Sequence, residues 1–301
     1  MKSRREEFER IEIQIHEEIP EYRRSLWKDV CVAFKAKKSA VVCLIFLIII
    51  VIAALCAPLS PYDPDALDAS GKLQGISAEH WLGTDEYGRD YFTRALYGGQ
   101  VSIVVGLMTM VVAIGIGTLI GTISGYVGGV VDAVLMRFTD VFMSLPGYLI
   151  AMILNLLLKP NVMTLILVLA LFSWPSVTRV TRAETMTLKQ RDFVCASKNL
   201  GASDRYVIFH HIIPNMVGQI SVAATLGIAH AILTESFLSY IGLGVQLPRA
   251  SWGSMLQGAQ KYLMNVPLLA IVPGVLILLT VLSFNVIGDV LRAALEPKGR
   301  K

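Results

Sequence analysis

The sequence predicts an all-α membrane protein with six transmembrane helices and both termini in the cytoplasm. Apolar residues make up 54% of the 301 residues and charged residues only 17%, and the mean hydropathy is +0.59. A soluble domain carries about 25% charged residues, and a disordered chain combines low hydrophobicity with high net charge. The net charge of +4 is not gathered on one soluble domain, so we expect no nucleic-acid partner.

Six stretches are apolar enough to cross a bilayer core of about 30 Å, which needs roughly 20 helical residues. They are residues 40–57, 101–123, 141–158, 162–180, 217–241 and 266–287. The third is interrupted by Pro146 and Gly147, and the fourth contains Pro175. We expect the first stretch to be a retained helix, because it is longer than the core of a signal peptide and follows 38 residues.

The distribution of Lys and Arg sets the orientation, since cytoplasmic loops carry the excess of positive charge. With the N-terminus inside, the cytoplasmic segments hold 21 of the 27 Lys and Arg residues and the outer segments hold 6. An even number of spans then returns the C-terminus to the cytoplasm.

The chain divides into four parts. Residues 1–38 form a cytoplasmic segment, and residues 39–98 hold the first transmembrane helix and an extracytoplasmic loop. Residues 99–291 form the transmembrane core with a cytoplasmic loop at 181–215, and residues 292–301 form a cytoplasmic tail.

An amphipathic stripe precedes the first span. Tyr22, Leu26, Val30 and Ala33 repeat at helical spacing among basic residues, which predicts a helix over 22–38 lying on membrane lipid. The alternative is a solvated helical tail, and residues 1–20 are left open.

The outer connection at 58–100 contains Pro58, Pro61 and Pro64, which do not fit a helix interior. A polar cluster follows at 84–90. We expect a folded cap over the outer mouth, because long loops of this kind are usually functional or self-packed. A calcium loop is the weaker alternative, since EF-hand spacing is missing.

Small residues recur at four-residue intervals in the second span, at Gly117, Gly121 and Gly125. Such a stripe lets two helix backbones approach closely. We expect a helix-packing seam, either static or sliding during a transport cycle.

A polar, basic segment separates the fourth and fifth spans. Residues 185–214 are too polar to span the membrane, and Gly201 followed by Ser203 and Asp204 is typical of a helix end and a new helix start. We therefore expect a cytoplasmic helix–turn–helix that docks another protein, with Pro214 marking its exit toward the membrane.

The motifs of several chemistries are missing. No G-x-x-x-x-G-K-[ST], H-E-x-x-H or G-x-S-x-G pattern occurs, and the four cysteines show no metal spacing. We expect no catalytic residue, no metal site and no cofactor bound by this chain.

Acidic residues within membrane spans are costly and suggest function. Glu235 either bonds a neighbouring helix or lines a path through the membrane. For Asp289 and Asp140 we favour ion pairs within one helix, with Arg292 and Arg137, each three residues away.

Residues 192–214 resemble the EAA loop of ABC importer membrane subunits, whose pattern is E-A-A, three residues, Gly, nine residues, I-x-L-P. Here the spacing is kept, although Cys195 replaces the acidic residue and only Ala196, Gly201 and Pro214 match by identity. The resemblance implies that this loop couples the chain to an ATPase. The coupling residues it implies are Cys195, Ala196, Ser197, Leu200, Gly201, Ala202, Ser203, Asp204 and Pro214.

Further stretches resemble the C-type permease subunits of the dipeptide/oligopeptide family. They are residues 80–90, 125–129 with Asp132, 251–256 and 284–292. The resemblance implies the type I ABC importer (MetI-like) fold and peptide cargo, with nickel chelates or another small solute as the alternative. It implies as partners a homologous permease subunit, two cytoplasmic ATPase subunits that bind ATP and Mg, and an extracytoplasmic substrate-binding protein. A membrane receptor or scaffold, or a membrane-embedded enzyme, is the competing class.

Overall fold

The computed structural model describes residues 26–158 and 161–295, and this part of the chain is helical without a β-strand. The helices are α1 (Leu26–Ala36), α2 (Lys38–Leu55), α3 (Tyr91–Val127), α4 (Gly129–Ser144), α5 (Gly147–Leu157), α6 (Val162–Lys189), α7 (Asp192–Asn199), α8 (Asp204–Val207), α9 (Ile213–Tyr240), α10 (Trp252–Ala259) and α11 (Leu268–Leu295). Short 3-10 turns follow α2 at Ala57–Leu59 and α10 at Gln260–Tyr262, and a π turn at Ile208–Ile212 joins α8 to α9.

Five helices of the described residues are long and apolar enough to cross a membrane, and the count is six if the bent pair α4–α5 is one span. The five are α2, α3, α6, the continuous run Asp204–Tyr240 and α11. The third predicted span, 141–158, contains the interruption expected at Pro146 and Gly147: α4 and α5 meet there at an angle of 79°. Pro146 lies at the break, where its missing N–H cannot continue a helix.

Several helices are longer than the apolar segments from which they were predicted. α3 has 37 residues and is therefore about 55 Å long at 1.5 Å per residue, well beyond a bilayer core of about 30 Å. Residues 124–140, which separate the second and third predicted spans, are helical except at Gly128, whose φ is +72°. The tail predicted from residue 292 begins as the last turn of α11, which ends at Leu295, and the rest of the tail lies outside the described residues.

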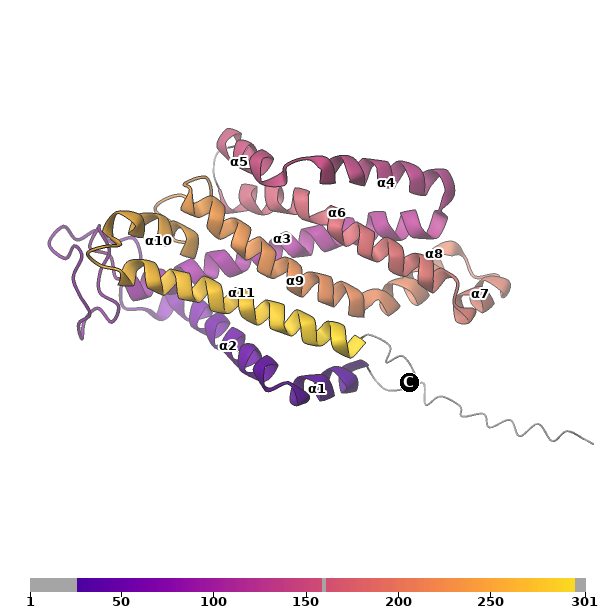
Figure 1. Ribbon diagram of the computed structural model, residues 1–301, viewed down its shortest axis with the longest axis horizontal. Coiled ribbons are helices and arrows are strands. Elements are labelled where there is room, and N and C mark those ends of the chain that lie inside the picture. Colours follow the sequence, from indigo (N-terminus) through magenta and orange to yellow (C-terminus); the bar gives the residue numbers. More distant parts are fainter. Residues whose placement is uncertain (1–25, 159–160, 296–301) are drawn as a thin grey trace, which may run out of the picture.

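The bundle has two distinct ends (Figure 1). The long helices run along the longest axis, with α4 and α5 beside α6 on one side and α2 and α11 on the other. Residues 58–90 and α10 lie together at one end, here called the cap end, and α7 and α8 lie at the opposite end, here called the turn end. Segments predicted to lie on opposite sides of the membrane are therefore at opposite ends of the molecule.

The segment before the first span is partly described. The predicted surface helix at 22–38 is seen from Leu26 as α1, which ends at Ala36 and is separated from α2 by the extended residue Lys37. α1 packs against α11 as well as α2. The prediction left open for residues 1–20 lies outside the described residues.

The most extensive helix packing among the described residues is between α3 and α6, and it depends on small residues. A Cβ added to Gly117 would lie 2.6 Å from Cβ of Val177, and one added to Gly125 would lie 2.7 Å from the carbonyl oxygen of Arg182. Gly121 is equally crowded, with Thr178 O at 2.5 Å from the added carbon. Because those distances leave no room for a side chain, the two backbones can approach only at glycine.

A tryptophan attaches the cap end to the core. Trp252 at the start of α10 is completely buried, and its Nε1 donates a 3.0 Å hydrogen bond to the carbonyl oxygen of Ala95 on α3. Gly98 and Gly99 of α3 lie directly against its side chain. The glycines thus leave the space that the indole ring fills.

Candidate functional site

The turn at Gly201 has the geometry of a Schellman helix end. Gly201 N donates to Lys198 O at 2.9 Å and Ala202 N to Ser197 O at 3.1 Å, and φ of Gly201 is +88°, a conformation that glycine adopts without penalty. Ser203 then begins α8, its Oγ accepting from the backbone N of Tyr206 at 3.3 Å. The helix–turn–helix expected here is present.

Its boundaries differ from the expectation in two ways. α6 continues to Lys189, so the predicted segment 185–214 begins inside that helix. Pro214 is not an exit from the helix: it lies in the first turn of α9, directly after the π turn Ile208–Ile212. A wide π turn before a proline accommodates the hydrogen bond that proline cannot donate, so the helix runs from Asp204 into the membrane span without a break.

One face of the turn is exposed and the other is fixed to the bundle. Leu200 is 89% exposed, and Cys195, Ala196 and Gly201 are exposed beside it. On the opposite face the buried residues form one apolar cluster, which contains Val194, Val207, Ile212 and Met216 together with Tyr126 at the end of α3. The turn thus presents an apolar side chain to its surroundings on a support that is packed against the bundle.

Polar contacts add to that attachment. Tyr126 Oη donates to Asp204 Oδ1 at 2.8 Å, and Lys198 Nζ pairs with the same Asp204 oxygen at 2.9 Å. Lys189 Nζ donates to the carbonyl oxygen of Tyr126 at 2.6 Å. The hydrogen bond to the Asp204 carboxylate, with a smaller contribution from Tyr126, raises the pKa of Lys198. The pair bridges the end of α7 and the start of α8, but both side chains are exposed, so the buried apolar cluster provides most of the attachment.

A second ion pair fixes α4 to α6. Arg182 donates from Nε and Nη2 to the two carboxylate oxygens of Asp132, each at 2.6 Å, and Ser124 on α3 donates to Asp132 as well. The two-pronged geometry is the strongest form of an arginine–carboxylate pair. Sequence reasoning quoted Asp132 as part of a motif but missed its partner, which lies 50 residues away.

Glu235 is completely buried near the end of α9. Its carboxylate accepts hydrogen bonds from Ser102 on α3 at 2.8 Å and from Ser239 at 2.7 Å, and Trp252 N donates to Ser102 Oγ at 3.3 Å. The group thus joins α3, α9 and α10. Of the two roles considered for it, this geometry favours the hydrogen bond to a neighbouring helix.

The two ion pairs predicted within single helices are wrong. Asp140 pairs with Arg179 on α6 at 2.7 Å and not with Arg137, because a helical side chain leans toward the N-terminus and Arg137 therefore leans away from Asp140. Asp289 makes no ion pair with Arg292, and both are exposed. Exposed pairs gain little attraction and lose side-chain freedom.

A mostly apolar hollow of about 230 Å³ with a few polar side chains opens between α4, α5, α6 and α9. Tyr148 Oη and His230 Nε2 lie 3.1 Å apart in its wall, with Ser173 and Ser176 nearby. His230 is exposed in the middle of a spanning helix. Sequence reasoning missed it, although a histidine inside an apolar span is itself a signal of function.

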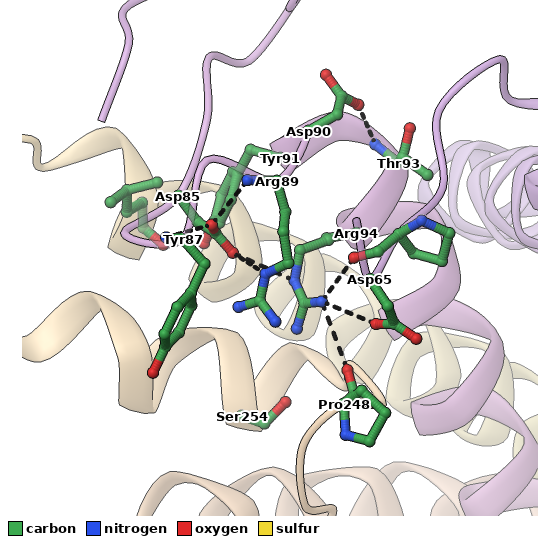
Figure 2. A network of polar contacts seen from close by, with 12 residues as sticks. Asp65, Asp85, Tyr87, Arg89, Asp90, Tyr91, Thr93, Arg94, Pro248 and Ser254 are labelled. Carbon is green, nitrogen blue, oxygen red and sulfur yellow. Dashed lines mark hydrogen bonds and ion pairs between the residues drawn. The ribbon is translucent and has the colours of Figure 1, made fainter. Parts of the chain in front are cut away.

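The cap at 58–90 is ordered by its own hydrogen bonds, including Leu73 N to Asp85 O at 3.0 Å and Thr84 N to Gln74 O at 3.1 Å. The Asp85 carboxylate is held by Arg89 and Arg94, as Figure 2 shows. That pairing occupies an oxygen ligand that a calcium loop would need. Within residues 26–158 and 161–295, no group of three His, Cys, Asp or Glu residues is placed to hold a metal ion.

Comparisons with known proteins agree with this arrangement. Residues 117–301 match the family described as binding-protein-dependent transport system inner membrane component, and residues 25–75 match the N-terminal TM domain of oligopeptide transport permease C. In the methionine ABC transporter MetNI, seen in inward-facing conformations, one chain superposes with a TM-score of 0.53 at 15% identity, covering 65% of this chain and 94% of that one. The fold is therefore that of a type I importer membrane subunit.

Three relatives match nearly end to end. The oligopeptide transport system permease protein OppC of Bacillus subtilis is 39% identical, over 95% of this chain and 94% of the relative. The dipeptide transport system permease protein DppC of Alkalihalophilus pseudofirmus is 38% identical, over 91% and 90%. The glutathione transport system permease protein GsiD of Escherichia coli is 36% identical, over 93% of each. On the strength of these matches, the chain belongs to the binding-protein-dependent transport system inner membrane components and is a multi-pass ABC importer permease subunit of the bacterial inner membrane.

Proposed function

We propose that this chain forms one half of the translocation path of an ATP-driven importer of di- or oligopeptides. The cargo is supported by the relatives, whose names specify dipeptide, oligopeptide and glutathione transport. Nickel chelates or another small solute are the alternative cargo. The second half of the path would come from a homologous permease subunit, and an extracytoplasmic binding protein would deliver the substrate.

The observation that carries the coupling role is the contrast between the two faces of the turn. Leu200 is 89% exposed, whereas Tyr126, Val194 and Val207 on the other face are buried against the bundle. A partner that binds Leu200 and Gly201 and then moves would therefore displace α3 and α9 together. We assign this turn as the site where one of two cytoplasmic ATPase subunits docks, with both chain termini on the same side of the membrane.

ATP chemistry then belongs to the partners. We propose that the ATPase subunits bind ATP and Mg, and that this chain binds no cofactor and catalyses no reaction. Closure of the ATPase pair would move the turn, and the run Asp204–Tyr240 would carry that motion into the span because Pro214 does not interrupt it.

We propose that the residues around the hollow at Tyr148 and His230 form part of the wall of the translocation path. An exposed histidine and two serines are unfavourable against lipid tails, so the face formed by α5, α6 and α9 would turn toward the second permease subunit and the water between them. The apolar residues of α2, including Ile45, Ile49 and Ile52, are exposed and would face lipid.

Purification of the tagged chain in a mild detergent tests the assembly. We expect a second six-helix permease and P-loop ATPases to copurify in fixed ratio, and Leu200→Asp to release the ATPases while retaining the permease. A chain that purifies alone or as a homo-oligomer from several detergents would contradict the importer assembly and favour a receptor or scaffold.

A further inference from the structure

Two nearly buried arginines lie side by side at the cap end (Figure 2). The side chains of Arg89 and Arg94 are 6% and 4% exposed. Asp85 Oδ2 lies 2.7 Å from Nε of Arg89 and 3.5 Å from Nε of Arg94. A single buried carboxylate therefore faces two guanidinium groups, and Asp65 is a second, partly exposed acid beside Arg94.

The terminal nitrogens of the two arginines differ in their hydrogen-bond partners. Nη1 of Arg94 lies 2.8 Å from the carbonyl oxygen of Pro64, 3.3 Å from Asp65 Oδ1 and 3.5 Å from the carbonyl oxygen of Pro248. Both terminal nitrogens of Arg89 and Nη2 of Arg94 have no hydrogen-bond partner among the residues the structure describes. These nitrogens are not enclosed by protein, since the buried side-chain atoms without a partner among the described residues are all threonine hydroxyls. They are therefore available to an acceptor that enters from outside this chain.

Those donors line a cavity of about 640 Å³ between the cap and α10. This volume lies within the range of sites that enclose small organic ligands. Its wall also carries Lys261 and Glu86, and the hydroxyl or amide groups of Tyr262, Ser254 and Gln257. The cavity is thus mainly polar, with the guanidinium groups of Arg89 and Arg94, the Asp85 carboxylate that pairs with both, and a further acid in Glu86.

We propose that this cavity binds the C-terminal carboxylate of a peptide on its way into the translocation path. The guanidinium fork matches a carboxylate in geometry as well as charge, and Glu86 supplies a negative charge for the ammonium group of a short peptide. The assignment rests on the proposed peptide cargo. It makes this chain a contributor to substrate selection at the cap end, in addition to the binding protein.

Uptake into proteoliposomes tests the site, using the complete importer with its binding protein and ATP on the ATPase side. The two probes are trialanine and trialanine amide, which differ only in the C-terminal carboxylate. They are compared for the wild type, Arg89→Gln, Arg89→Lys and Arg249→Gln. Arg249 is the matched control because it is an exposed arginine at the same end of the molecule without a hydrogen bond among the described residues.

We expect Arg89→Gln to lower trialanine uptake at subsaturating peptide about tenfold, equivalent to ~1.4 kcal/mol, and to change amide uptake less than about twofold. Arg89→Lys should restore part of the loss, and Arg249→Gln should match the wild type. Because the binding protein is identical in every reaction, the change in the ratio of the two peptides reports on this chain alone.

Other outcomes would overturn the site. An equal fall for both peptides would mean that Arg89 only supports the fold, and an unchanged ratio would mean that no carboxylate binds there. Weaker association of the peptide-free binding protein with the Arg89→Gln complex would assign the arginines to an acidic group of that protein. If the wild type takes up neither peptide, the proposed cargo itself fails, whereas normal amide uptake by every variant leaves the importer function intact.

Discussion

Tyr126, in the last turn of α3, donates a 2.8 Å hydrogen bond from its Oη to Asp204 Oδ1, in the first turn of α8. The two residues are 78 positions apart in the sequence. Nζ of Lys189 and of Lys198 lie 5.4 Å and 5.3 Å from the centre of the tyrosine ring, within the range of cation–π attraction. The end of a membrane-spanning helix and the exposed turn are therefore held as one unit.

Removal of that hydroxyl should loosen the coupling. Because the hydroxyl joins the end of α3 to the exposed turn, we expect Tyr126→Phe to keep ATP hydrolysis but to lower the peptide transported per ATP several-fold. Tyr240→Phe is the control, since its partly exposed hydroxyl makes no hydrogen bond to a described residue. An unchanged ratio of peptide transported to ATP hydrolysed in Tyr126→Phe would show that this hydrogen bond does not contribute to coupling.

The backbone of Gly201 should tolerate few replacements. Proline requires φ near −65°, far from the observed +88°, and would also remove the hydrogen bond to Lys198 O. We expect Gly201→Pro to abolish transport with membrane insertion retained. Gly201→Ala should cost only ~1 kcal/mol, since no atom lies near the added Cβ. Normal transport by Gly201→Pro would remove this turn from the mechanism.

Leu200 should contribute to partner binding and not to the fold. Because its side chain is 89% exposed, Leu200→Asp should leave thermal stability within ~0.5 kcal/mol and weaken ATPase binding at least about tenfold. Met264→Asp is the matched control, because Met264 is 93% exposed at the cap end. Binding is measured by titrating each purified variant with the purified ATPase. Equal affinity of Leu200→Asp and Met264→Asp for the ATPase would contradict the docking role.

The α3–α6 seam should reject any side chain. A Cβ at Gly121 would lie 2.5 Å from Thr178 O and 2.9 Å from Arg182 N, and overpacking typically costs about 1–3 kcal/mol. We expect Gly121→Val to lower the melting temperature of the purified complex or to prevent assembly. Gly115→Val, in the same helix but with open space around it, should melt like the wild type. Equal melting of the two variants would contradict the seam.

The carboxyl group of Glu235 should act through its hydrogen bonds. Glu235→Gln keeps an acceptor for Ser102 and Ser239 and should retain most transport, whereas Glu235→Leu leaves buried hydroxyls unpaired at about 1–3 kcal/mol each. Transport rate and melting temperature, measured together, separate the two effects. Complete loss of transport by a normally assembled Glu235→Gln would indicate that the negative charge itself is needed.

Hydropathy predicted the membrane class and the approximate position of every span, because burial in lipid demands about 20 apolar residues in each. It could not locate helix ends. α3 and α6 extend past their apolar runs because polar residues such as Arg182 and Lys189 pair with neighbouring elements. The proline at 146 and the glycine after it marked the real break between α4 and α5.

The candidate site was predicted only as far as local spacing allows. The order of Gly201, Ser203 and Asp204 reveals a helix end and a helix start, because these are local backbone requirements. The contacts of Asp204 with Tyr126, of Asp132 with Arg182 and of Asp140 with Arg179 join residues 39–78 positions apart. Such pairs depend on which helices are neighbours, and periodicity within one segment does not contain that information.

ATP-dependent peptide uptake by the reconstituted complex, measured side by side for the wild type and Gly201→Pro, tests the central claim most directly. The account predicts that the wild type accumulates peptide only when ATP is supplied on the ATPase side, and that Gly201→Pro inserts and assembles its permease partner but accumulates none. Uptake without ATP, or equal uptake by the two proteins, would contradict the assignment of this chain as a permease driven through its exposed turn.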